Sequence, residues 1–212
     1  MKSQCALCEI RACSAEPGTK QYPKFCPTRQ EDGEAALEKA RARYDDEATR
    51  QFALAAARTE ADRYPLETRV EEVMSFARRI GATHLGIASC AGLLREARLL
   101  LEILEANGFV VESVCCKVGS IPKEDIGLLD EEKIRPGQFE ALCNPIGQAE
   151  LLNAAGTQLN IVVGLCVGHD SLFFKYSEAP VTVLVAKDRV TGHNPAAVLY
   201  TSSSYYSRIK TE

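Results

Sequence analysis

Short apolar segments alternate with helix-forming segments over most of the chain, and this alternation most constrains the fold. Four apolar segments predict buried strands, at residues 84–88, 109–115, 160–166 and 181–186. The first three are separated by a Leu-rich helical segment at 93–106 and by a helix that begins at Asn144-Pro145 and ends near Gly156. This order predicts an α/β domain with a mainly parallel open sheet of about four strands and flanking helices.

The composition changes along the chain and divides it into three parts. Residues 1–30 have few apolar side chains, two proline breaks and no helical or strand period, so they predict a small cysteine-rich module that needs a metal for cohesion. Residues 31–64 are rich in Ala, Glu, Arg and Leu and predict a connector of two helices with a break at Asp45-Asp46. Residues 65–212 form the predicted α/β domain, whose first helix starts with a capping box, Thr68 to Glu71.

Charge and hydropathy exclude several classes of partner. The 212 residues carry a net charge of −4, and this balance disfavours nucleic acid, which requires a basic surface. The apolar runs are too short to span a bilayer, and the start of the chain lacks an apolar signal core. We therefore expect a cytoplasmic protein that does not bind membranes. Its nine cysteines are then reduced thiols, which serve as ligands or nucleophiles rather than as disulfides.

The first four cysteines have the spacing of a metal site. Cys5, Cys8, Cys13 and Cys26 form the pattern C-x2-C-x4-C-x12-C, and Pro27 follows the last of them. A C-x2-C turn directs two sulfurs toward one metal, and an ending in Cys-Pro is similar to that of bacterial ferredoxins. The long last gap costs only about 1.2 kcal/mol in loop closure, against about 10 to 16 kcal/mol for binding a structural metal. The pattern favours a 4Fe-4S cluster, and the alternatives are structural zinc and thiols that are either unligated or redox-active.

The first thirty residues also carry a local excess of positive charge. They hold five basic and two acidic side chains, a net charge of +3. Such charges offset the negative charge of a thiolate-bound cluster, or they form a solvated basic face.

The remaining cysteines stand near the ends of predicted strands. Cys90 follows the first strand, Cys115 and Cys116 close the second, Cys166 closes the third, and Cys143 precedes a helix. The carboxyl ends of parallel strands form the edge at which open α/β sheets bind ligands. Neighbouring strand residues point to opposite faces, so only one of the adjacent pair reaches a shared centre, and Cys116 is favoured because it lies further out. Cys90, Cys116, Cys143 and Cys166 therefore predict a second 4Fe-4S site. Buried structural cysteines and thiol-based catalysis are the alternatives.

The stretch CVGHDS at residues 166–171 is the other candidate for chemistry, and we interpret it as a loop. His169 is the candidate catalytic residue, as a proton donor, a metal ligand or a hydrogen-bond partner of Asp170. A plain turn with a surface histidine fits the same residues. Backbone N–H groups after Cys90 and at Asn144 are expected to point at cluster sulfurs or at an anionic ligand.

A long connection at residues 117–142 contains several glycines and prolines and leads into Cys143. Connections of this length are often lids or binding loops. We expect it to cover the second site, where Lys117, Lys123 or Arg135 would meet an acidic small molecule; an ordinary surface loop is the alternative.

Several of these motifs together resemble a known family. The run GLCVGHDSLFFKYSEAPVTVLVAKDRVTGHNP at 164–195, the N-terminal cysteines, and the segments 89–93 and 143–145 resemble uncharacterised cysteine-rich proteins labelled metal-binding, the domain of unknown function eighteen-forty-seven. The resemblance covers nearly the whole chain. It implies metal binding through cysteine in mostly anaerobic microbes, with no assigned reaction, and it does not distinguish iron from zinc.

The sequence thus predicts a metal-binding protein that carries one or two 4Fe-4S clusters and serves in redox chemistry or electron transfer. A redox protein partner would deliver electrons at the N-terminal cysteines, and a small-molecule substrate would bind at the inner cluster under the lid. The protein would be either an electron carrier or a redox enzyme. The competing prediction is a non-enzymatic zinc protein with one structural four-cysteine site.

Overall fold

The computed structural model describes residues 3–210, which belong to two compact units divided between Asp62 and Arg63. The smaller unit holds three short 3-10 turns, η1 (Cys5–Leu7), η2 (Ala12–Ser14) and η3 (Pro27–Arg29), followed by helices α1 (Glu31–Arg43) and α2 (Glu47–Asp62). These two helices and the break between them match the prediction for this part of the chain. Each helix has a single buried residue, Gly33 in α1 and Ala55 in α2. Hydrophobic burial therefore contributes little to this unit.

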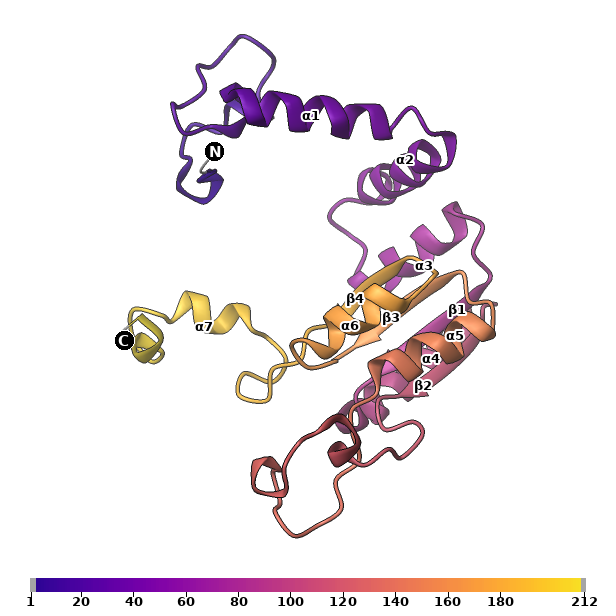
Figure 1. Ribbon diagram of the computed structural model, residues 1–212. Coiled ribbons are helices and arrows are strands. Elements are labelled where there is room, and N and C mark those ends of the chain that lie inside the picture. The colour runs from indigo at the N-terminus through magenta and orange to yellow at the C-terminus, as the bar shows by residue number, and fades with distance from the viewer. Residues whose placement is uncertain (1–2, 211–212) are drawn as a thin grey trace. The chain divides into compact units, whose positions relative to one another are not determined.

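The larger unit is built on a sheet of four parallel strands in the order β2-β1-β3-β4 (Figure 1). The strands are β1 (His84–Ser89), β2 (Val110–Cys115), β3 (Leu159–Val163) and β4 (Val181–Val185). Ser89 at the end of β1 pairs with Cys115 on one side and Val163 on the other, so the three strands end level. The predicted α/β fold is confirmed, and the sheet is entirely parallel.

Helices surround this sheet: α3 (Arg69–Arg79), α4 (Leu94–Ala106), α5 (Pro145–Ala154) and α6 (His169–Tyr176). The predicted capping box at Thr68 is present and begins α3. Because crossovers between parallel strands are right-handed, α4 lies on one face and α5 and α6 on the other. Short helices α7 (Ala196–Tyr200) and η7 (Ser207–Lys210) follow the sheet. No helix within residues 3–210 is both long and apolar enough to cross a bilayer.

One close approach between β1 and β3 requires a glycine. A Cβ atom on Gly86 would lie 2.0 Å from Oδ1 of Asn160 and 3.0 Å from the side chain of Leu152. The Asn160 side chain is held in place, since it accepts a hydrogen bond from Thr157 Oγ1 at 2.8 Å and donates one to Ser177 Oγ at 2.9 Å. The amide therefore fills the space that a side chain at position 86 would need.

The structure corrects two sequence-based predictions beyond β3. The strand ends at Val163 rather than at Cys166, because Gly164 takes a left-handed conformation with φ of 71°. The segment interpreted as a loop instead leads directly into α6, which begins at His169. This helix has only eight residues and is anchored by the fully buried Phe173. Its stability comes from tertiary packing, which a short segment does not reveal through its period.

Candidate functional site

Four cysteines from separate segments line one cavity of about 800 Å³ at the carboxyl edge of the sheet. Cys90 directly follows β1, Cys116 directly follows β2, Cys143 precedes α5, and Cys166 lies between β3 and α6. We call these four residues the inner quartet. Cys115 is instead half-buried against the hydrophobic core and is not part of the cavity wall. The residues that the sequence singled out thus lie together, and their role as ligands stays a prediction.

Backbone N–H groups point at two sulfurs of the inner quartet. After β1 the chain turns into a short 3-10 helix, η4 (Ala91–Leu93). The Ala91 N–H donates to Cys116 Sγ at 3.3 Å, and the Gly92 N–H donates to Cys90 Sγ at 3.4 Å. The N–H groups after Cys90 thus point at cysteine sulfurs, and their expected role toward cluster sulfurs or an anionic ligand stays a prediction. At the other expected position, Gly147 N–H donates to the side chain of the Asn144 cap.

Cys143 has a lowered pKa, whereas its neighbour Cys116 has a raised one. A hydrogen bond from Cys116 lowers the pKa of Cys143 to about 5, and the ammonium of Lys117, 3.2 Å from Cys143 Sγ, and the charge of His169 act in the same direction. Burial opposes them. The same hydrogen bond raises the pKa of the Cys116 thiol. The two pKa values shift in opposite directions, so Cys143 is the member of the pair that loses its proton more readily.

Cys166 pairs with a cation that the sequence analysis did not identify. The guanidinium of Arg189 donates to Cys166 Sγ at 3.1 Å, and this contact raises the pKa of Arg189. Arg189 lies in the loop after β4, which is closed by two contacts: the Asp188 N–H donates to His193 Nδ1 at 3.2 Å, and the His193 N–H donates to Asp188 O at 2.8 Å. The sequence feature that could have identified Arg189 is its position shortly after the fourth predicted strand.

Lys187 comes from the same loop and also lines the cavity. Its ammonium lies beside Gly92, where an added Cβ would be 3.2 Å from Nζ and 3.9 Å from Cys90 Sγ. The absence of a side chain at position 92 thus lets both the ammonium and the sulfur approach the backbone.

His169, the candidate catalytic residue, is the first residue of α6 and forms part of the cavity wall. Its backbone N–H donates to Cys166 O at 2.9 Å, which fixes the start of the helix beside the sulfur. Asp170 does not need the imidazole as a partner, since its Oδ1 accepts from the N–H groups of Gly168 and Ser171 at 3.0 and 2.8 Å. His169 therefore lines the cavity, while the Asp170 carboxylate binds backbone N–H groups at the start of the helix.

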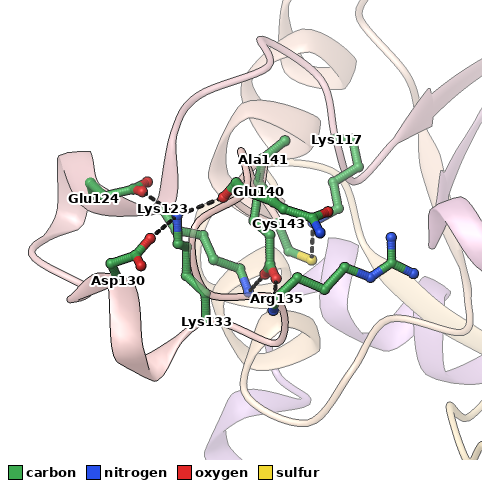
Figure 2. Close-up of polar contacts among 10 residues, drawn as sticks. Lys117, Lys123, Glu124, Asp130, Lys133, Arg135, Glu140, Ala141 and Cys143 are labelled. Atoms are coloured by element: carbon green, nitrogen blue, oxygen red, sulfur yellow. Dashed lines mark hydrogen bonds and ion pairs between the residues drawn. The ribbon is translucent and has the colours of Figure 1, made fainter.

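Ion pairs organise the connection at residues 117–142, which we call the lid (Figure 2). Lys123 contacts Glu140 at 2.6 Å, and the buried Lys133 contacts Glu124 at 2.7 Å and Asp130 at 2.6 Å. These contacts with Lys133 lower the pKa of both Glu124 and Asp130 and raise that of Lys133. The lid is thus an ordered structure with its own polar core.

The lid forms one wall of the cavity and presents apolar side chains there. Its antiparallel base pairs Pro122 with Ala141, next to Cys143. Figure 2 shows the side chain of Arg135 extending away from the ion pairs of Lys133. The lining residues from the lid include Ile126, Leu128, Ile134, Arg135 and Phe139.

The first four cysteines line a smaller cavity of about 240 Å³ within the N-terminal unit. We call Cys5, Cys8, Cys13 and Cys26 the N-terminal quartet. Cys26 is buried and Cys8 is half-buried, while Cys5 and Cys13 are exposed. A 3-10 turn joins the first pair, since the Cys8 N–H donates to Cys5 O at 3.0 Å. The C-x2-C spacing thus forms the tight turn on which the prediction of a metal site depends.

Both quartets gather sulfurs without forming a ready-made site for a single ion. Within residues 3–210, no three His, Cys, Asp or Glu side chains are arranged so that they would hold one metal ion. The identity of the metal stays a prediction from the sequence.

Comparison with known proteins identifies the relatives of this chain. The family described as "Protein of unknown function (DUF1847)" matches residues 26–184. An uncharacterized protein of Methanocaldococcus jannaschii is 45% identical over 183 residues, which cover 86% of this chain and 92% of that protein. No solved structure matches. The matched range contains the whole inner quartet and the lid, and the chain belongs to this family of unknown function, DUF1847.

Proposed function

We propose that this protein binds 4Fe-4S clusters through its two cysteine quartets and serves in electron transfer or redox chemistry. The inner quartet would hold one cluster, and the N-terminal quartet would hold a second one that exchanges electrons with a redox protein partner. Because its nine cysteines are free thiols, we place this activity in a reducing compartment, the cytoplasm.

One observation carries the proposal: four sulfurs from four separate segments meet in one cavity, and each has a donor or a cation beside it. Thiolates are the ligands that iron-sulfur clusters use. Backbone N–H groups reach Cys90 and Cys116, and Lys117 and Arg189 reach Cys143 and Cys166. A core of buried cysteines would not need this arrangement, since an apolar thiol has no demand for cations.

The surrounding groups have distinct roles toward the sulfurs. When bound, a 4Fe-4S cluster supplies a centre that accepts and releases single electrons. The N–H groups of Ala91 and Gly92 stabilise negative charge on sulfur and so favour the reduced state. Lys117 and Arg189 compensate the thiolate charge, and His169 is positioned to supply a proton to a small molecule in the cavity.

The test is anaerobic purification followed by analysis of iron and acid-labile sulfide. We expect brown protein with about two clusters per chain, by the count of two quartets. Cys8→Ser should remove about half of the iron, and Cys166→Ser should remove the other half, because each quartet holds its own cluster.

Adjacent residues provide a matched control for the inner site. Cys116→Ser should lose the inner cluster, whereas Cys115→Ser should keep it, because of these two neighbours Cys116 lines the cavity and Cys115 does not. Colourless protein with one zinc per chain would support a structural four-cysteine site and overturn the proposal. Loss of all iron in either Cys8→Ser or Cys166→Ser would contradict two independent sites.

A further inference from the structure

Two cations in the inner cavity are not used by the protein itself. Lys117 contacts Cys143, Arg189 contacts Cys166, and Lys123 contacts Glu140. Among residues 3–210, neither the Arg135 guanidinium nor the Lys187 ammonium has a hydrogen-bond or ion-pair partner, although both line the cavity. Unpaired cations in a concave site attract an anion.

The acidic residues of the cavity wall do not pair with Arg135 or Lys187. Both carboxylate oxygens of Glu140 accept hydrogen bonds, one from Lys123 at 2.6 Å and the other from the Arg135 backbone N–H at 2.5 Å. Glu132 accepts from the Leu129 N–H at 2.8 Å. The free positive charge of Arg135 and Lys187 is therefore available to a ligand.

The wall opposite the sheet edge is apolar and exposed. Ile134 and Phe139 expose 84% and 65% of their surface, and Ile126 exposes 67%, although all three line the cavity. When a ligand covers exposed apolar surface of this kind, the free energy of binding becomes more favourable. The ligand thus needs an apolar body as well as a negative charge.

The backbone N–H groups around the cavity argue against a phosphate. Phosphate sites commonly use free N–H groups at helix starts. Here Ala91 and Gly92 donate to sulfurs, Gly147 donates to Asn144, and Ser171 donates to Asp170. The groups left for the anion are a planar guanidinium and an ammonium, a pair suited to a carboxylate.

We propose that the cavity binds a small carboxylic acid with an aliphatic or aromatic body, as the substrate class of the inner site. Arg135 and Lys187 hold the carboxylate, and Ile134 and Phe139 cover the body. This assignment rests on the proposed function, because it takes the acid to bind beside the inner cluster.

The experiment is calorimetric titration of the anaerobically purified full chain with benzoate, hexanoate, benzamide and inorganic phosphate. We expect benzoate and hexanoate to bind, and benzamide and phosphate to bind at least tenfold more weakly. Arg135→Gln and Lys187→Gln should each weaken benzoate binding about tenfold or more, since each removes a charge-assisted contact. Arg98→Gln is the matched control, because Arg98 lies on α4 in an exposed pair with Glu102 and should leave the affinity unchanged.

Iron content, measured on the same samples, separates this inference from the proposed function. It should be equal in all of these variants, because the donors that reach the sulfurs of the inner quartet are Ala91, Gly92, Lys117 and Arg189, which stay unchanged. Two results at full iron content would overturn the carboxylate site alone. One is a benzoate affinity that is unchanged in the Arg135 and Lys187 variants, and the other is phosphate binding as tight as benzoate binding. Protein without iron that still binds benzoate through Arg135 and Lys187 would overturn the clusters and support the carboxylate site.

Discussion

The two cysteine quartets use opposite strategies to bring four sulfurs together. The N-terminal quartet lies within one short segment, in which Cys5 and Cys13 are exposed and tight turns supply the local structure. The inner quartet comes from four segments separated by strands and helices, and it stands on a sheet whose central strands are buried. One site is local and weakly supported, and the other is assembled by the fold.

This difference indicates which interactions hold the cysteines of each quartet in place. A segment without a core has little packing energy to offset the entropy of fixing its backbone, and in our proposal a bound metal provides that energy. The inner sulfurs are positioned by strand ends and by residues such as Gln148, whether or not a metal is bound. Gln148 is fully buried and donates to Ser89 O at 3.1 Å and to Val114 O at 2.6 Å, so it joins the ends of β1 and β2.

The largest expected effect is the response to removal of metal. In the full chain treated with an iron chelator, the backbone amides of residues 5–29 should lose their protection from hydrogen exchange completely. Structural metal binding is worth about 10 to 16 kcal/mol in small peptides, and little else holds this segment. The amides of β1 and β3 should keep their protection, because their core remains. Hydrogen exchange with mass spectrometry measures both, and unchanged protection at 5–29 in iron-free protein would contradict the comparison.

A glycine in each unit gives the next contrast. Gly86→Ala should destabilise the larger unit by about 3 kcal/mol, because the new methyl group collides with the fixed Asn160 amide. Gly18→Ala meets no atom within 4 Å and strains only a backbone with φ of 85°, at a cost of about 1 kcal/mol. Denaturant unfolding followed by circular dichroism measures the first change. If both variants unfold like the parent, the larger unit is less tightly packed than its buried strands indicate.

Gln148 tests how the core supports the inner site. Gln148→Met keeps a side chain of similar length but removes the amide that donates to the carbonyls of Ser89 and Val114, at a cost of about 2 kcal/mol. The midpoint of denaturant unfolding should fall, and the retention of iron at the inner quartet should fall with it. Iron at the N-terminal quartet should be unaffected. Equal loss of iron from both quartets would show that Gln148 does not act on the inner site alone.

The sequence predicted those residues of the inner site that stand directly after a strand. Cys90 and Cys116 stand directly after β1 and β2, so apolar runs and the rule for parallel sheets were sufficient to bring them together. Lys187 and Arg189 stand after β4 in the same way but were missed. Their placement depends on the loop after that strand folding back, which the contacts of Asp188 with His193 secure.

Elements stabilised by distant partners were the ones that the sequence did not reveal. Helix α6 has eight residues, and its anchor Phe173 is buried against other elements rather than along a regular helical stripe. The buried Lys133 of the lid was also not predicted, although its partners are only nine and three residues away. A single lysine in a polar loop carries no signal of burial, because burial is decided by the charges that fold around it.

The smallest expected effect concerns the lid, which lines the cavity of the inner quartet. Contacts with Lys133 lower the pKa of Glu124 and Asp130, so these carboxylates contribute stability above their ordinary pKa values, and this contribution is lost as the pH falls through the lowered values. Hydrogen-exchange protection of residues 123–140, corrected for intrinsic exchange rates, should therefore decrease below about pH 4, where carboxylates begin to protonate. Lys133→Met should reduce this decrease, leaving the part that comes from the Lys123–Glu140 pair, and should lower the protection at neutral pH, because two carboxylates then lie near each other without a cation. Protection that stays constant with pH in the parent protein would show that the ion pairs do not order the lid.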